Sequence, residues 1–137
     1  MTKSVKKPAK LKKRILTSLQ QKQHNFAFGF KGELQAIEFL KQNNFEIIDT
    51  NIRIKNSEVD IIALDKKHQE LVFCEVKARA TSYYGDPSHA VNRKKIKSMD
   101  FVARNYLKRK KLNYDYRFDI IAITPDGVEH YENVTWS

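Results

Sequence analysis

The sequence of 137 residues contains a single cysteine and no long hydrophobic run. Cys74 cannot form an internal disulfide, and the cysteine and four histidines do not have the spacing of a zinc site. No segment approaches the roughly 18 to 20 apolar residues that cross a bilayer, and the basic N-terminal residues lack the apolar segment of a signal peptide. We therefore expect a cytoplasmic protein without a membrane partner, in which any bound metal has oxygen ligands.

The length suits one domain that can bury one hydrophobic core. Hydrophobic residues make up 41% of the chain and charged residues 31%, a composition that predicts a folded protein with a highly charged surface. We find no internal repeat and no interdomain linker.

The positive charge is concentrated in two segments. The net charge of +10 and a pI near 9.7 indicate a polyanionic partner, most commonly nucleic acid and next an anionic membrane surface. The first fourteen residues hold seven basic residues and no acid, and residues 88–111 hold nine basic residues with Asp100 as the only acid. A solvated helix face and a solubilising tail would show the same charge pattern, so charge alone leaves the function open.

The hydrophobic spacing predicts seven elements in the order αβββαββ. Residues 1–23 are expected to form a basic, flexible N-terminal arm, and residues 24–137 a single domain. The expected elements are a helix over Asn25–Gln42, strands over Phe45–Ile54, Val59–Leu64 and Leu71–Ala78, a long helix over Ser88–Lys110, and strands over Arg117–Thr124 and Val128–Val134.

Charged residues occur where these strands should be apolar. Because strand side chains alternate, Glu75 and Lys77 share one face with Phe73. Asp60 interrupts the adjoining strand, and an antiparallel hairpin would bring its carboxylate beside that of Glu75. Two unpaired buried carboxylates repel and are costly to desolvate, so the pair requires a proton or a cation.

These groups match the requirements of phosphodiester cleavage. Asp60 and Glu75 offer hard oxygen ligands for Mg²⁺ or Mn²⁺, and the carbonyl of Val76 would complete the site. Lys77 would hold the attacking water or lower its pKa. Glu33, on the inner edge of the first helix, would bind the metal directly, through water, or as a ligand of a second ion.

The context of these residues matters because the spacing acid-x-Lys is not specific. It recurs over residues 65–67, in a predicted turn. Three further charged residues are left outside the catalytic set. Glu58 is expected to be exposed, Arg79 to contact phosphate or flank the sheet, and Asp119 to pair with Arg117 or with a basic residue of the long helix.

Five motifs follow one another along the chain: GEL..A..FL (Gly32–Leu40), SEVDII (Ser57–Ile62), FCEVKAR (Phe73–Arg79), YGDP..AV (Tyr84–Val91) and RFDIIAI (Arg117–Ile123). In this order they resemble the YraN-type family of small bacterial restriction-endonuclease-like proteins, which is itself similar to archaeal Holliday-junction resolvases. The resemblance covers about Gly29 to Thr124.

The resemblance implies an α/β fold of the restriction-endonuclease-like kind, with a mixed central sheet flanked by helices. It also implies a PD-(D/E)xK nuclease centre with Glu33, Asp60, Glu75 and Lys77 as catalytic residues, the three acids binding Mg²⁺ or Mn²⁺. The expected substrate is DNA, including branched or abnormal structures by analogy with resolvases, and a homodimer is left open. The alternatives are a noncatalytic nucleic-acid-binding protein that retains the nuclease fold, and a ribosome-associated or scaffold protein.

Five residues are expected to contact nucleic acid. Tyr84 lies in an aromatic loop, where it would stack on an unpaired base or cover the core. The other four belong to the basic helix: Arg93, Lys94, Lys95 and Lys97. Because no helix-turn-helix or zinc finger is present, shape-selective or nonspecific binding is favoured.

Overall fold

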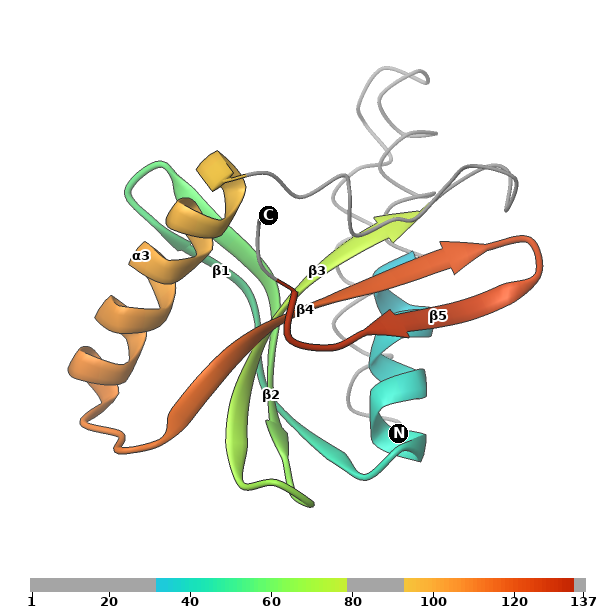
Figure 1. Ribbon diagram of the computed structural model, residues 1–137, viewed down its shortest axis with the longest axis horizontal. Helices are drawn as coiled ribbons and strands as arrows, with labels where there is room; N and C mark the ends of the chain where they lie inside the picture. The colour runs from blue at the N-terminus through green and yellow to red at the C-terminus, as the bar shows by residue number, and fades with distance from the viewer. Residues whose placement is uncertain (1–31, 79–92, 135–137) are drawn as a thin grey trace, which may run out of the picture.

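The computed structural model describes residues 32–78 and 93–134, which form a mixed α/β unit (Figure 1). The elements are a helix over residues 32–42, β1 (Phe45–Ile54), β2 (Ser57–Asp65), β3 (Glu70–Ala78), α3 (Arg93–Lys110), β4 (Asp115–Thr124) and β5 (Gly127–Tyr131). The predicted order αβββαββ is confirmed. Neither helix in this part of the chain is long and apolar enough to cross a membrane.

The five strands form one sheet in the order β1-β2-β3-β4-β5. Only β3 and β4 are parallel, which confirms the predicted mixed sheet. Parallel neighbours need a crossover, and α3 lies in the connection between them. The pairing of β2 with β3 stops at Ile61 and Cys74, whereas the pairing of β3 with β4 continues to Ala78 and Ile123. The C-terminal end of β3 therefore extends beyond its pairing with β2.

Among the described residues, one helix covers each face of the sheet (Figure 1). The two layers bury separate apolar clusters because alternate side chains of a strand point to opposite faces. The first cluster joins the helix over residues 32–42 to the sheet and includes Ala36, Leu40, Ile61, Val72, Cys74 and Ile121. The second joins α3 to the sheet and includes Ile62, Leu71, Phe73, Met99, Val102 and Tyr106.

The element boundaries differ from the predicted ones mainly at their ends. The helix ends at the predicted asparagines: Asn44 has a φ of 70°, and Nδ2 of Asn43 donates to the carbonyl of Phe39 at 2.8 Å. The prediction that the last strand reaches Val134 is wrong, because Asn133 has a φ of 52° that breaks the extended conformation. The arm and residues 25–31 and 88–92 lie outside the described residues.

Candidate active site

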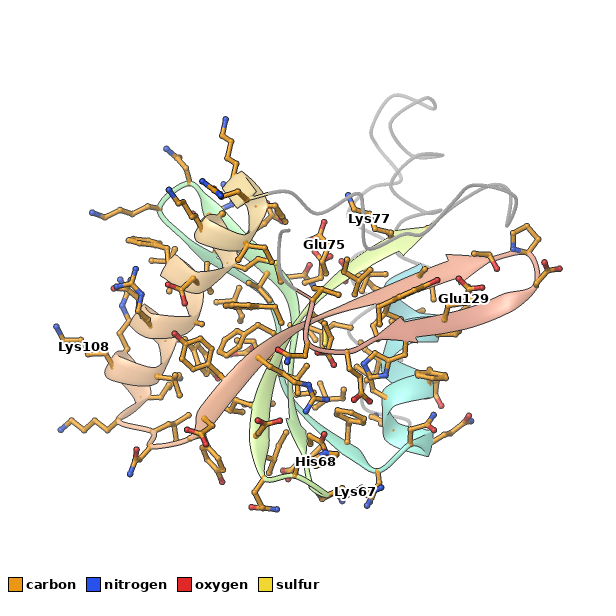
Figure 2. The ribbon with its side chains drawn as sticks, in the orientation of Figure 1. Lys67, His68, Glu75, Lys77, Lys108 and Glu129 are labelled. Atoms are coloured by element: carbon orange, nitrogen blue, oxygen red, sulfur yellow. The ribbon has the colours of Figure 1, made fainter. Side chains whose placement is uncertain are left out.

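The site begins with two charged side chains near the C-terminal end of β3. Glu75 and Lys77 have the parity of Phe73, which packs in the α3 cluster, while Cys74 and Val76 face the other layer. The predicted division of faces is therefore confirmed. Only 11% of the Glu75 side chain is exposed, against 37% for Lys77. Figure 2 shows both residues at the end of the sheet opposite the turn that carries Lys67.

Asp60 lies where β2 separates from β3. The last backbone pair joins Ile61 to Cys74, so one further step in the same register places Asp60 opposite Glu75. At this point Oδ2 of Asp60 accepts a hydrogen bond of 2.7 Å from the backbone N–H of Val76. The carboxylate thereby satisfies a donor of β3 that the backbone ladder of β2 no longer reaches. The hairpin brings the two carboxylates together as the sequence predicted.

Two lysines neutralise Glu75 from different elements. Lys77 Nζ lies 3.4 Å from Glu75 Oε2, and Lys95 Nζ, from the first turn of α3, lies 3.1 Å from Glu75 Oε1. Lys95 was expected only as a contact to nucleic acid, and the structure places it at the carboxylates. The sequence could have indicated that Lys95 faces the sheet. Lys95 precedes the buried residues Met99 and Val102 by four and seven positions, which places the three on one side of a helix.

Glu33 approaches from the helix on the opposite face. It is half-buried, and its Oε1 accepts a hydrogen bond of 3.3 Å from Asn51 Nδ2. The preceding Gly32 packs closely on β3, where a Cβ atom on it would lie 3.2 Å from Cβ of Ala78. This close approach brings the helix to the end of β3, and the charge of Glu33 acts on Asp60.

The environment of Asp60 favours its protonated form. Burial, followed by the negative charge of Glu75, raises the pKa of Asp60 from 3.8 to about 7. The charge of Glu33 adds to this effect, while the hydrogen bond from Val76 and the charge of Lys95 oppose it. A carboxylate in this setting is stabilised when a cation replaces the proton.

Replacing Asp60 by asparagine should make the stability of the metal-free protein less dependent on pH. Between pH 3.8 and about 7 the folded state keeps a proton that the unfolded state has released. The contribution of Asp60 to stability is thus complete below the lower value and is lost as the pH rises through the higher one. Between about pH 5 and pH 8, the free energy of unfolding should fall by about 2 kcal/mol more in the wild type than in Asp60→Asn.

Urea unfolding in EDTA at both pH values would measure this difference. The asparagine retains an oxygen that can accept the hydrogen bond from Val76, so the substitution mainly removes the ionisable group. Parallel loss of stability in the two proteins would contradict the raised pKa of Asp60.

The donor set fits a hard divalent ion. Asp60 and Glu75 offer carboxylate oxygens, which Mg²⁺ and Mn²⁺ prefer, and Glu33 is the third acid near them. Within residues 32–78 and 93–134, no three acidic, histidine or cysteine side chains are grouped closely enough to hold an ion without rearrangement. An ion held by the carboxylates of Asp60 and Glu75 alone would leave positions for water or phosphate oxygens.

The residues expected to contact nucleic acid differ in their exposure. Arg93, Lys94 and Lys97 are exposed on the first two turns of α3, whereas Lys95 is half-buried. Tyr84 lies outside the described residues, as does Arg79, which had been left outside the catalytic set.

Glu58 and Asp119 both belong to ion pairs rather than to the candidate site. Glu58 is exposed, as predicted, and pairs with Arg53 at 2.8 Å. Asp119 pairs with Arg117, one of the two partners predicted for it, with Arg117 Nε 3.0 Å from Asp119 Oδ1.

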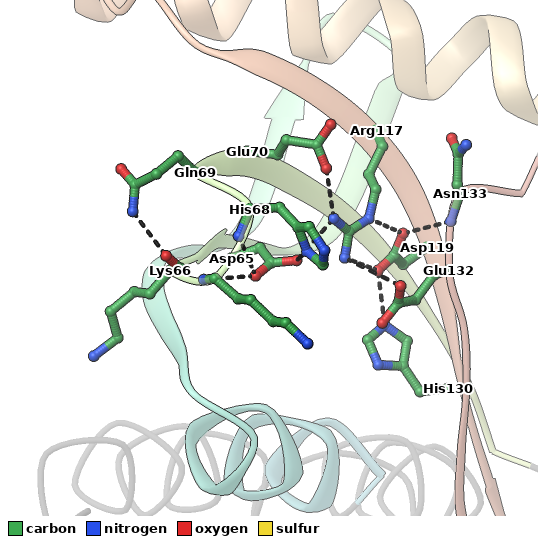
Figure 3. A network of polar contacts seen from close by, with 11 residues as sticks. Asp65, Lys66, His68, Gln69, Glu70, Arg117, Asp119, His130, Glu132 and Asn133 are labelled. Carbon is green, nitrogen blue, oxygen red and sulfur yellow. Dashed lines mark hydrogen bonds and ion pairs between the residues drawn. The ribbon is translucent and has the colours of Figure 1, made fainter.

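A second charged cluster lies on the other face of the sheet (Figure 3). The sequence predicted one of its ion pairs but not the network as a whole. Nη1 of Arg117 lies 2.9 Å from Asp65 Oδ2 and 2.7 Å from Glu70 Oε1. His130 Nε2 lies 2.7 Å from Oδ2 of Asp119, which is fully buried. Arg117 also lies over the ring of Phe45, in the layer that packs on the helix over residues 32–42. The cluster is therefore separate from Glu75 and Lys77, which face α3.

The comparisons with known proteins identify the family. A model described as "Uncharacterised protein family UPF0102" matches residues 32–123. The chain belongs to UPF0102. The predicted YraN-type family is thereby confirmed. All four catalytic candidates of this UPF0102 chain lie in the matched segment: Glu33, Asp60, Glu75 and Lys77.

Individual UPF0102 proteins match most of the chain. A UPF0102 protein of Geobacter metallireducens is 37% identical over 115 residues, which cover 80% of this chain and 93% of that protein. One from Geobacter sulfurreducens is 43% identical over 116 residues, covering 80% and 89%. The crystal structure of SSO0001 aligns with 98% of this chain and 63% of its own, at 15% identity and a TM-score of 0.41. A likeness this weak supports no statement about activity.

Proposed function

We propose that this UPF0102 protein is a metal-dependent endonuclease that hydrolyses phosphodiester bonds in DNA. The proposal rests on the meeting of Asp60, Glu75 and Lys77 where β2 separates from β3. Two carboxylates and an ammonium group at one sheet end offer both a site for a divalent ion and a cation for the attacking water. The nuclease-like fold of the family supports this proposal.

Each residue has a distinct role in the proposed reaction. Asp60 and Glu75 would hold Mg²⁺ or Mn²⁺, which when bound supplies a Lewis acid for the phosphate oxygens and for water. Lys77, with its ammonium group beside Glu75 and partly exposed, would orient the attacking water and stabilise developing negative charge. Glu33 is proposed as a third ligand, direct or through water.

The exposed basic residues of α3 supply the proposed surface for DNA. Arg93, Lys94 and Lys97 lie in the first two turns of the helix whose Lys95 contacts Glu75. Phosphate contacts of this kind position a duplex without reading its sequence. We therefore propose shape-selective or nonspecific binding of DNA, with branched or abnormal structures among the substrates to test.

One observation favours a second candidate, a noncatalytic nucleic-acid-binding protein. Both oxygens of Glu75 already lie beside lysine ammonium groups, so this carboxylate is neutralised without a metal. In that case the basic face of α3 would bind nucleic acid while the acids and lysines stabilise the end of the sheet.

Cleavage of plasmid and four-way-junction DNA separates these two functions. The wild type should cut at least one of them with Mg²⁺ or Mn²⁺ and neither in EDTA, because the carboxylates need the ion. Asp60→Ala, purified in parallel, should show only background cutting and thus controls for a contaminating nuclease. Wild-type protein that binds both DNAs and cuts neither with either ion would overturn the nuclease and leave the noncatalytic binding protein.

A further inference from the structure

Lys95 differs from its basic neighbours on α3 because it faces the sheet. It lies on the stripe of α3 that continues through Met99, Val102 and Tyr106. Its side chain is 30% exposed, and its Nζ lies 3.1 Å from Glu75 Oε1. Its charge also acts on Asp60. Lys95 is therefore part of the carboxylate site, although its helix presents a basic face to solvent.

The position of Lys95 conflicts with metal binding at Glu75. Each carboxylate oxygen of Glu75 lies beside an ammonium group, Oε1 beside Lys95 and Oε2 beside Lys77. A divalent ion on Glu75 would bind at least one of these oxygens, and its charge would repel the ammonium group beside that oxygen. Lys77 belongs to the same strand as Glu75, whereas Lys95 reaches it from α3. In the proposed reaction Lys77 stays at the site to orient the attacking water, so Lys95 is the ammonium group that moves, by rotation of its own side chain.

A displaced Lys95 would need a new anion. The first turn of α3 holds Arg93, Lys94 and Lys95 and no acid. The N-terminus of a helix carries partial positive charge, so basic residues are unfavourable there unless an anion compensates them. Glu75 supplies that anion in the structure. Once an ion has taken this carboxylate, a phosphate of DNA bound along the exposed residues of the same turn could replace it as the anion for Lys95.

We infer that Lys95 is a displaceable counter-ion, which holds Glu75 in the free protein and moves to a DNA phosphate when a divalent ion binds. This inference rests on the proposed function, since it concerns the same metal and the same substrate. It makes the binding of ion and DNA cooperative: each removes a competitor of the other, and the two effects must be equal in free energy. Lys95 is thus a positioning residue rather than one that acts on the reacting atoms.

Calcium binding with and without DNA tests this role. Ca²⁺ takes the same oxygen ligands as Mg²⁺ and is expected to support little cleavage, so both equilibria can be measured by calorimetry. Without DNA, Lys95→Met should bind Ca²⁺ about fivefold more tightly than the wild type, because no ammonium group has to leave Oε1. Ca²⁺ should raise the affinity of the wild type for a short duplex by about fivefold or more, and by a smaller factor in Lys95→Met.

Lys94→Met is the matched control, because it removes the same charge from the adjacent, exposed position. It should weaken duplex binding while keeping both the wild-type Ca²⁺ affinity and the wild-type enhancement by Ca²⁺. If Lys95→Met behaves like Lys94→Met while the wild type binds Ca²⁺, the counter-ion role alone is overturned. If the wild type binds no Ca²⁺ at millimolar concentration, the proposed metal centre fails, and the inference fails with it.

Discussion

Replacing Lys77 by methionine is expected to slow phosphodiester cleavage by about 10² or more, the usual scale for one electrostatic contributor in a preorganised site. Methionine keeps most of the apolar stem and removes the charge. The fold should survive because Glu75 keeps the ammonium group of Lys95 at 3.1 Å. Metal and DNA binding should also survive, since Asp60, Glu75 and the exposed face of α3 are unchanged. Lys77 would then be needed for the cleavage step and not for the binding of metal or DNA.

Single-turnover cleavage with Mg²⁺, together with DNA binding in Ca²⁺, measures this separation. Lys67→Met is the matched control, because Lys67 follows Asp65 at the same acid-x-Lys spacing. It is exposed in the β2–β3 turn, at the other end of the sheet from Lys77 (Figure 2), and its loss should leave the rate unchanged. A Lys77→Met protein that cuts as fast as the wild type would exclude the proposed mechanism. One that unfolds would instead assign Lys77 to neutralising the buried carboxylates.

Replacing Arg117 by methionine should lower the free energy of unfolding by about 3 kcal/mol or more. The Arg117 side chain is 7% exposed and contacts Asp119, Asp65 and Glu70. Asp119 is fully buried, so the substitution leaves a carboxylate in the core with fewer partners. The cost arises mainly from the anions left behind rather than from the attraction that is lost.

The same variant should lose less stability than the wild type as the pH falls from 3.8 toward about 2, the range in which the carboxyl of Asp65 is protonated. Burial works to raise the pKa of Asp65, but hydrogen bonds from His68 and Arg117 outweigh it and hold the pKa at about 2. This lowered pKa contributes stability above the ordinary value of 3.8 that is lost as the pH falls toward about 2. Without Arg117, part of that stability is already absent at neutral pH.

Urea unfolding at neutral pH compares Arg117→Met with Arg104→Met. Arg104 pairs with Asp100 at 2.8 Å on the surface of α3, where its side chain is 65% exposed. A surface pair contributes about 0 to 1 kcal/mol, so this control should unfold almost as the wild type does. Similar stability of the two variants would show that the buried cluster is not a major source of stability.

Much of the fold could be predicted because it depends on local patterns. The strand over Phe45–Ile54 was predicted with its observed bounds, and the helix C-terminus at the two asparagines was also predicted. The juxtaposition of Asp60 and Glu75 followed from the short turn between β2 and β3. In an antiparallel hairpin the register determines every opposite pair, so two distant residues become neighbours without knowledge of the rest of the chain.

Residues that meet through crossover connections could not be placed in this way. The spacing of Lys95 shows that it lies on the buried side of α3, but not which strand that side covers. The register of β4 against β3 depends on a crossover rather than a hairpin, so the carboxylates around Arg117 could not be identified from β4 alone.

The sequence by itself determined the order αβββαββ, the apolar faces of the elements, and the strand parity that puts Glu75 and Lys77 on one side. These features follow from the periodicities of helix and strand, which act over a few residues. Only the tertiary structure decided that Lys95 reaches Glu75, and that Arg117 of β4 contacts Asp65 of β2 and Glu70 of β3. These contacts join helices and strands that are far apart in the sequence. They depend on how the layers pack together, which the periodicity of a single element does not specify.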